Sequence, residues 1–294
     1  MKKSIQKLMI YLLALLMCGL VFSITAMAEV LPSVTYCTHV QNEGWQNYVS
    51  NGAMSGTEGK SYRLEGIKIK LVSQGYDLGL AYQTHIQNIG WEADTGRGWK
   101  TSDTVSGTEG LSYRLEAIQI KLTGADADQF ELYYQVHAQN IGWMGWAKNG
   151  ESAGTAGYGY RLEGIRIKIV PKGSAAPGST SNAFVQPSAV EQLLNKMNGN
   201  WIYQNSYGKN IFRITKTSPT TGHLVYEQYV GGGDTMEFDF WINGINPDGT
   251  TTLYMDMDSV IDYGITPNFS TIPANTLMDQ PNSIIFFKAM FTRL

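Results

Sequence analysis

One short phrase, rich in polar residues and closed by tryptophan, occurs three times in the first half of this chain. Its copies, YCTHVQNEGW, YQTHIQNIGW and YQVHAQNIGW, begin at Tyr36, Tyr82 and Tyr134. A second phrase, YRLE followed by an alternating apolar run, closes each unit and begins at Tyr62, Tyr113 and Tyr160. A unit of this size with a few short strands cannot bury its apolar face alone, so the three must share one core.

Both phrases have the two-residue period of β-strands. In YQTHIQ, the side chains that point one way are Tyr82, Thr84 and Ile86, and those that point the other way are Gln83, His85 and Gln87. In the second phrase the alternation slips at Glu116-Ala117, where the sister units have glycine, which predicts a β-bulge. The loop between the phrases ends in GTEG or GTAG, whose glycines supply the positive φ angles of a tight turn.

These patterns predict one all-β repeat domain over residues 34–172, built from units 34–72, 80–123 and 132–170. A closed pseudo-threefold arrangement, of the β-prism or β-trefoil kind, explains why three copies suffice. An open stack would need capping repeats at its ends, and none is visible. Abundant glycine, tyrosine and tryptophan suit such a turn-rich fold.

The repeated set Y-x-x-H-x-Q-x-x-G-W, G-T-x-G and R-L-E-[GA]-I-x-I-x-[LI] resembles the clostridial hydrophobic repeat with a signature Gly-Trp, the ChW repeat, over about Val34 to Val170. The resemblance implies an exported or surface protein of clostridia or related Gram-positive bacteria, whose repeats bind polysaccharide or protein partners. It supplies no catalytic residues. Cys37 in place of glutamine and Glu43 in place of isoleucine lead us to expect the first unit to have the weakest site.

Two interpretations of the repeated tryptophans, Trp45, Trp91 and Trp143, stay open. A large aromatic side chain just after a strand is usually packed in the core, which is the more common outcome. Alternatively, each ring is a platform for a sugar ring, with Gln and His side chains bonding the sugar hydroxyls. Trp99 and Trp146 lie in variable loops and are not repeated, so they are the better candidates for contact with a partner.

A polar row on the first strand of the unit is a further candidate for glycan or partner binding. Its members are Gln83, His85 and Gln87 in the second unit, and Gln135, His137 and Gln139 in the third. A row that faces solvent, or hydrogen-bonds to the next unit, explains the same pattern and is slightly favoured. The three equivalent histidines could also meet on the axis and hold Zn²⁺, but no nearby cysteine supports this, so we expect no metal and no cofactor.

An arginine and a glutamate two residues apart begin the second phrase of every unit. They are Arg63 and Glu65, Arg114 and Glu116, and Arg161 and Glu163. Each arginine shares a strand face with its glutamate and would hold the carboxylate ionised, which argues against acid–base catalysis. We expect structural ion pairs that tie the units together.

The first 28 residues have the layout of a secretory signal peptide. Three lysines precede an apolar run from Leu8 to Ile24, and Ala-Met-Ala places small residues just before Glu29. We expect a secreted, extracellular protein, in solution or on the cell wall, with no membrane span after cleavage. An uncleaved anchor and a lipid-modified Cys18 are less favoured alternatives, the latter because the residue before Cys18 is not small.

Charge argues against one class of partner, and cysteine content excludes one kind of covalent link. The formal net charge is −3, and it becomes more negative once the lysines of the signal are removed. An acidic chain with scattered basic residues lacks the electrostatic footprint of a nucleic-acid-binding protein. Only Cys37 survives cleavage, so an intramolecular disulfide is impossible.

A stretch rich in proline, glycine and serine, residues 173–187, predicts a linker. Residues 188–294 then predict one short helix capped by Ser188, followed by a small antiparallel β-barrel. Gly199-Asn200-Trp201 and the closing Arg293 resemble the G-x-W motif and C-terminal arginine of lipocalin-like (calycin) barrels. The resemblance implies that Trp201 plugs the closed end and Arg293 packs across it; whether such a barrel encloses a small apolar ligand or is packed solid stays open.

No catalytic motif stands out. SGTEGKS resembles a phosphate loop, but Met54 occupies the place of its first glycine. The chain lacks G-x-S-x-G and H-E-x-x-H patterns. The acidic set Asp256, Asp258 and Asp262 lacks the glycine of a Ca²⁺ loop, and His223 has no evident nucleophile beside it. We expect that the protein is not an enzyme.

The combined expectation is an exported, non-catalytic binding protein whose repeats attach to cell-wall polysaccharide or to a surface protein. Weak single sites would gain affinity from threefold presentation through effective concentration. In one alternative, the C-terminal barrel binds a small apolar ligand or acts as an inhibitor, and the repeats anchor it. In another, the least favoured, the barrel hydrolyses a substrate by an unfamiliar constellation.

Overall fold

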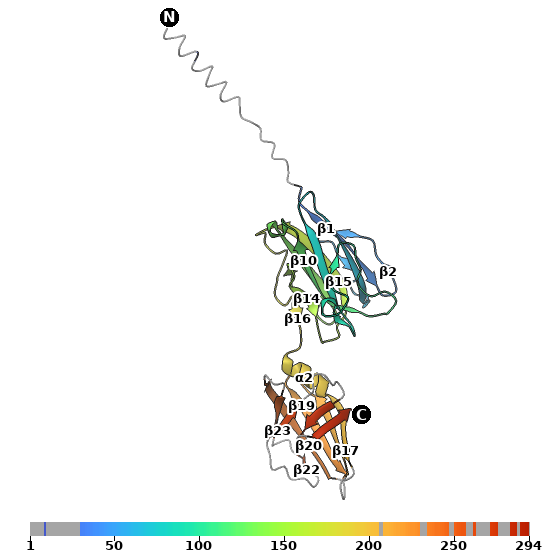
Figure 1. Ribbon diagram of the computed structural model, residues 1–294, viewed down its shortest axis with the longest axis vertical. Coiled ribbons are helices and arrows are strands. Elements are labelled where there is room, and N and C mark those ends of the chain that lie inside the picture. The colour runs from blue at the N-terminus through green and yellow to red at the C-terminus, as the bar shows by residue number, and fades with distance from the viewer. Residues whose placement is uncertain are drawn as a thin grey trace.

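The computed structural model describes Met9 and residues 30–205, 208–229, 234–246, 250–256, 261–262, 271–275, 283–286 and 289–293. The expected signal peptide, Met9 apart, lies outside the described residues, as does Cys18. Figure 1 shows two β-rich bodies, the repeats first and the C-terminal strands after α2 (Ala189–Met197). Each body has its own cluster of buried apolar side chains. In the described part of the chain, no helix has the length and apolar character that a membrane crossing requires.

Each unit of the repeat domain contributes one pair of long antiparallel strands. The pairs are β1 (Ser33–Val40) with β5 (Leu64–Val72), β6 (Gly79–Ile86) with β10 (Leu115–Thr123), and β11 (Phe130–Ala138) with β15 (Leu162–Pro171). The short elements are β2 (Gly44–Trp45), β3 (Val49–Ser50), β4 (Ser55–Gly56), β7 (Gly90–Trp91), η1 (Glu92–Asp94), β8 (Lys100–Thr101), β9 (Ser106–Gly107), η2 (Ala127–Gln129), β12 (Gly142–Trp143), β13 (Ala147–Lys148) and β14 (Ser152–Thr155). Apolar side chains on one face of the six long strands form the shared core.

Every unit contributes one short strand to the sheet of another unit, and we call this short strand the lent strand. The first unit's β4 pairs with β15 of the third, the second unit's β9 with β5 of the first, and the third unit's β14 with β10 of the second. The exchanges close a cycle, so no unit has an end that needs a capping repeat. The all-β, pseudo-threefold expectation is confirmed, and three separate sheets, one for each unit, are the arrangement expected of a β-prism.

Each lent strand has a glycine where it pairs with the long strand of the other unit. The φ angles of Gly56, Gly107 and Gly154 are +109°, +111° and +113°. A Cβ atom at Gly56 would overlap the carbonyl oxygen of Glu163, and one at Gly107 would overlap that of Glu65. Glycine is therefore required for two reasons. The backbone has a positive φ, and the backbones of two units approach each other closely at this position.

The bulge expected at Glu116-Ala117 is confirmed, and it occurs in all three units. The register between the long strands shifts so that Glu65, Glu116 and Glu163 have no cross-strand partner. A bulge changes the direction of the side chains around it. Here it brings each glutamate beside the histidine of the facing strand.

The tyrosine that begins the first phrase reaches across to a neighbouring unit. The hydroxyl of Tyr36 accepts a hydrogen bond from the amide of Ile167 at 2.9 Å, and that of Tyr82 accepts one from Ile69 at 3.2 Å. Burial is the largest cause that raises the pKa of Tyr36 to about 12, and burial also raises the pKa of Tyr82 and of Tyr134. These tyrosines therefore link the units from inside the core.

Part of the expected linker, residues 173–187, is attached to the repeat domain. Within it, β16 (Phe184–Val185) pairs in parallel with β14, and the amide of Gly154 donates to the carbonyl of Ala183 at 2.9 Å. The sheet of the second unit thereby has six strands, and the other two repeat sheets have five. We call residues 178–185 the strap.

The C-terminal body begins with the expected helix, α2, where the Ser188 hydroxyl accepts a hydrogen bond from the amide of Glu191 at 3.1 Å. The strands are β17 (Gly199–Asn205), β18 (Gly208–Lys216), β19 (Thr221–Tyr229), β20 (Asp234–Ile245), β21 (Thr250–Met255), β22 (Ile261–Asp262), β23 (Thr271–Asn275), β24 (Ser283–Phe286) and β25 (Ala289–Arg293). They form one antiparallel nine-stranded sheet, in which the β17–β25 and β19–β20 pairings return the strand path to its start. The antiparallel arrangement expected from the sequence is confirmed, and the closed barrel stays a prediction.

Candidate functional site

The repeated histidine and tryptophan lie side by side in every unit. The short strand that carries the tryptophan pairs with the end of the first long strand, which sets His39 opposite Trp45, His85 opposite Trp91 and His137 opposite Trp143. In each pair the rings meet edge to face, with centroids 5.4, 5.5 and 5.5 Å apart. We call the three pairs, together with the glutamate and arginine beside them, the His–Trp clusters.

The bulge glutamate joins histidine to arginine within each cluster. The histidine Nδ1 lies 3.1, 3.0 and 3.2 Å from a carboxylate oxygen of Glu65, Glu116 and Glu163. The other carboxylate oxygen lies 2.7, 2.7 and 2.8 Å from a guanidinium nitrogen of Arg63, Arg114 and Arg161. The expected ion pairs are thus confirmed.

The expectation that these ion pairs tie the units together is wrong. Each arginine directly precedes the strand that carries its glutamate, so both partners of the ion pair belong to the same unit. The main chain of the same glutamate makes the link instead. The amide of Thr108 in the second unit donates to the carbonyl of Glu65 in the first at 2.8 Å.

The signature tryptophans do not belong to the core. Trp45, Trp91 and Trp143 are half-buried and lie outside the cluster of buried apolar residues in the repeats. The more common interpretation of these rings is therefore wrong. The core is filled by the tyrosines of the same phrase, such as Tyr82, which is fully buried.

Charged side chains cover two of the three tryptophan rings. The Lys68 ammonium lies 4.4 Å from the ring centroid of Trp45, and the Arg166 guanidinium lies 4.2 Å from that of Trp143. Both are cation–π distances. In addition, the Trp45 indole nitrogen donates to the carboxylate of Glu109 in the second unit at 2.6 Å.

The ring of Trp91 has a different neighbour. The position that corresponds to Lys68 and Arg166 is Gln119 in the second unit, which carries no charge. The ring centroid of Phe184, in the strap, lies 6.4 Å from that of Trp91, and the two ring planes are tilted by 43°. The three clusters are therefore alike in their His–Glu–Arg part and different at the tryptophan face.

The residue after the signature tryptophan caps the outer edge of the lent strand. In the first unit, Gln46 accepts from the amide of Gly56 at 2.7 Å and donates to its carbonyl at 3.2 Å. In the second unit, a carboxylate oxygen of Glu92 lies 3.5 Å from the amide of Gly107, and Arg97 donates to that glycine's carbonyl. The third unit has Met144 at this position.

Two glutamines of the polar row hydrogen-bond to internal partners. Gln83 is only 4 % exposed, and its amide donates to Gln119 at 2.7 Å and accepts from the amide of Ala93 at 2.7 Å. Gln135 donates to the carbonyl of Met144 at 2.7 Å. Glycan binding by Gln83 is thus contradicted, and internal hydrogen bonding holds for both glutamines.

The remaining members of the row are half-buried. These are His85, Gln87, His137 and Gln139. Cys37, which replaces the glutamine in the first unit, is buried, and that burial raises the pKa of its thiol. A difference at such a buried position gives no reason to expect a weaker surface site in the first unit.

The loop tryptophans differ from what their position in the sequence suggested. Trp146 is only 7 % exposed, because the strap folds over it and the main chain of Gly178 approaches its indole ring. The expectation of an exposed contact residue is wrong here. Trp99 is half-buried, and the Lys121 ammonium lies 4.3 Å from its ring centroid.

The three histidines do not meet on an axis. His39, His85 and His137 belong to three different sheets, and each contacts its own glutamate and tryptophan. Over the residues that the structure describes, no group of three or more His, Cys, Asp or Glu side chains is placed to hold a metal ion.

In the C-terminal body, Trp201 is fully buried and its indole nitrogen donates to the carbonyl of Met197 at 2.6 Å. The register of β17 and β25 sets Trp201 opposite Arg293, whose side chain lies outside the described residues. This register agrees with the lipocalin-like resemblance, which remains a prediction.

Of the polar residues considered for catalysis, the structure describes the side chains of His223 and Asp256. The Nδ1 atom of His223 lies 2.8 Å from a carboxylate oxygen of Asp239. Asp256 directly follows β21 and is exposed, and Asp262 is on β22, with its side chain outside the described part. Asp258 lies outside the described residues altogether.

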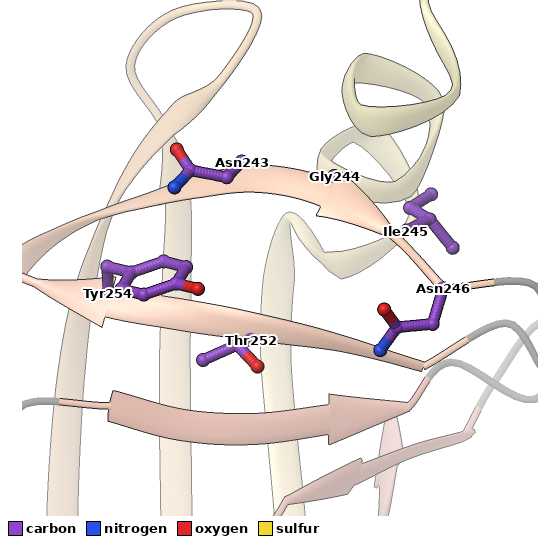
Figure 2. Close-up of a pocket in the computed structure, with 6 residues that line it drawn as sticks. All are labelled: Asn243, Gly244, Ile245, Asn246, Thr252 and Tyr254. Atoms are coloured by element: carbon purple, nitrogen blue, oxygen red, sulfur yellow. The ribbon is translucent and has the colours of Figure 1, made fainter.

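A surface hollow of about 260 Å³ in the C-terminal body was not anticipated from the sequence. It is lined by Asn243, Gly244, Ile245, Asn246, Thr252 and Tyr254. Figure 2 shows that these residues come from two neighbouring strands, β20 and β21, and from the chain just after β20. Amide and hydroxyl groups suit a hydroxyl-bearing ligand better than the apolar ligand considered for a barrel interior.

The comparisons with known proteins agree with the repeat structure. Residues 39–73, 85–124 and 137–171 match the family described as Clostridial hydrophobic W. Each match begins at the histidine of a His–Trp cluster and extends to the end of the second long strand. The chain has no match among the curated proteins or the solved structures. The first body of this chain is therefore a domain of three ChW repeats.

Proposed function

We propose that the protein is exported and that its ChW repeats attach it, without catalysis, to polysaccharide of the Gram-positive cell wall. The observation that carries the proposal is the half-buried state of Trp45, Trp91 and Trp143, each of which lies beside a His–Glu–Arg set of the same geometry. A large aromatic ring kept partly in water forgoes stabilising burial, which is expected where the ring contacts a partner.

The chemistry of the clusters suits a sugar. Lys68, Phe184 and Arg166 occupy part of the three indole rings, and the part that stays in water is available to sugar C–H groups. The histidine and basic side chains beside each ring can donate hydrogen bonds to sugar hydroxyls. The fixed His–Glu–Arg part orients the ring in every unit. Three weak sites on one rigid domain gain avidity on a polymer that repeats its own units.

A depletion assay tests this proposal. The full-length mature chain is mixed with purified Gram-positive cell walls, cellulose, xylan or chitin, and the unbound protein is measured. We expect depletion by cell walls, and its loss when Trp45, Trp91 and Trp143 are all replaced by Ala. Single replacements should reduce the bound fraction less, because two sites remain.

The matched control is Val72→Ala, an exposed apolar residue of the repeat domain at the opposite end of β5 from the cluster. It should be depleted as fully as the wild type. If the triple tryptophan variant also binds walls as the wild type does, the clusters are not the binding sites. If no polysaccharide depletes the wild type, the glycan proposal fails, and a protein partner or a small ligand of the C-terminal body becomes the leading idea.

The alternative function, uptake of a small apolar ligand by the C-terminal body, has less support. The hollow in Figure 2 is lined mainly by polar groups. An apolar fluorescent dye that is bound by the full chain, and displaced by a fatty acid, would revive this alternative.

A further inference from the structure

Two aromatic rings lie together on the outer face of the C-terminal sheet. Trp241 on β20 is directly opposite Tyr254 on β21, and the two rings are nearly parallel, at 17°, with centroids 5.7 Å apart. Trp241 is 39 % exposed, whereas Ile242 beside it in sequence is buried in the core. We call this stacked pair the aromatic platform, and Trp241 is its exposed member.

A β-bulge shapes the surface on one side of this platform. The register of β20 and β21 shifts between Ile242 and Ile245, so Asn243 and Gly244 together oppose one residue of the other strand. The hydroxyl of Thr251 donates to the carbonyl of Gly244 at 2.6 Å, which fixes the bulge. Bulges often direct side chains toward a site, and this one forms the wall of the hollow in Figure 2.

A second hollow, of about 230 Å³, lies on the other side of the platform. It is lined by Thr217, Thr221, Asp239, Phe240, Trp241 and Asp256. Tyr254 lines the first hollow and Trp241 lines the second, so the aromatic pair separates them. The outer face of β20 and β21 thus has an amide end, an aromatic middle and a carboxylate end.

We propose that this face binds a neutral oligosaccharide, with one sugar ring on Trp241 and Tyr254 and its neighbours in the two hollows. Flat aromatic rings contact the C–H faces of sugars, and amide groups donate to and accept from adjacent hydroxyls. The carboxylates of Asp239 and Asp256 accept hydrogen bonds from hydroxyls and repel uronic acids and phosphates. The site is separate from the ChW repeats and does not depend on their proposed function.

Calorimetric titration of the full-length mature chain tests the proposal, with cellohexaose, xylohexaose and an N-acetylglucosamine hexasaccharide as probes and an oligogalacturonide as the acidic comparison. We expect one or more neutral probes to bind and the acidic probe not to bind. Trp241→Ala should weaken the association constant by about tenfold or more, the loss of one aromatic contact. Trp241→Phe should lose less, because it keeps a flat ring.

The matched control is Tyr229→Ala. Tyr229 is 50 % exposed on β19 of the same body and lines neither hollow. It should bind the neutral probe with wild-type affinity. Replacing Trp45, Trp91 and Trp143 together should also leave hexasaccharide binding intact, which separates this site from the repeats.

Three results would overturn the proposal. The first is that none of the neutral hexasaccharides binds the wild type. The second is that the oligogalacturonide binds as well as they do. The third is that both Trp241→Ala and Trp241→Phe keep wild-type affinity. Circular dichroism confirms that each variant is folded before titration, and the Phe variant decides the outcome if the Ala variant does not fold.

Discussion

The three ChW repeats cover one equivalent strand edge in three different ways. Next to Gly56, the amide of Gln46 supplies both a donor and an acceptor; next to Gly107, the pair Glu92 and Arg97 does so. Next to Gly154, the strap adds a strand of main chain. Backbone groups at a sheet edge must be satisfied, and an open edge invites aggregation.

The difference shows which residue decides how an edge is protected. Gln46 and Glu92 directly follow the signature tryptophan, and both have side-chain groups that can hydrogen-bond to the glycine main chain. The third unit has Met144 there, which is buried in the core and has no such group. The strap therefore completes the third unit, and the repeat domain extends beyond the last residue of its last ChW match.

The largest expected effect comes from replacing the glycine that all three lent strands contain. Gly107→Ala places a Cβ against the carbonyl oxygen of Glu65 at a φ of +111°. We expect it to lower the free energy of unfolding by about 3 kcal/mol or more, because two backbones must separate. Urea unfolding of the mature chain measures this.

Gly110 in the same loop is the matched control for this change. It has a φ of +74° and no atom within 4 Å of an added Cβ. Gly110→Ala should therefore cost only the conformational strain, about 1 kcal/mol. Equal costs at the two glycines would show that close approach between units is not what requires Gly107.

The second prediction places methionine, the residue that follows the signature tryptophan in the third unit, at the same position of the first two units. Glu92→Met removes a fully buried carboxylate that contacts Arg97 and accepts a hydrogen bond from Ser106, and should cost about 3 kcal/mol. Gln46→Met removes a half-buried cap and should cost about 1–2 kcal/mol. Thermal unfolding at fixed pH compares the two. A larger cost at Gln46 would contradict the importance of buried charge at the second edge.

Much of the repeat domain could be predicted from the sequence because its rules are local and repeated. The two-residue period and the slip at Glu116-Ala117 together predict both the strand faces and the bulge. The need for a shared core predicts closure of three units. The C-terminal helix is likewise predicted by Ser188 and by the apolar pattern after it.

The parts that were missed depend on contacts between distant segments. Trp146 is buried by a segment more than thirty residues later, whose glycine and serine content is typical of a free linker. The core position expected for the signature tryptophans is occupied by tyrosines that reach across to neighbouring units. The platform of Trp241 and Tyr254 depends on strand register, which a single sequence does not specify.

A smaller effect is expected from loosening the strap. Phe184→Ala removes the ring beside Trp91 and should destabilise the domain by about 1–2 kcal/mol, because the side chain is only half-buried. Acrylamide quenching of tryptophan fluorescence should increase, since Trp146 lies under the same strap. Leu111→Ala, at an exposed position in a turn of the second unit, is the control and should change neither quantity. Unchanged quenching in Phe184→Ala would mean that main-chain pairing alone holds the strap.

The smallest expected effect concerns the buried tyrosine hydroxyls, which link neighbouring units in the same way. A phenol is neutral when protonated, and burial raises the pKa of Tyr36 from 10.0 to about 12 in the folded chain. The stability from this shift is fully present below pH 10 and is lost as the pH rises toward 12, reaching a loss of about 1 kcal/mol near pH 11. Because burial raises the pKa of Tyr82 in the same direction, Tyr36→Phe and Tyr82→Phe should each flatten the alkaline fall in unfolding free energy by a similar amount. A flattening in one variant alone would show that the first two units differ in their core links as well as at their edges.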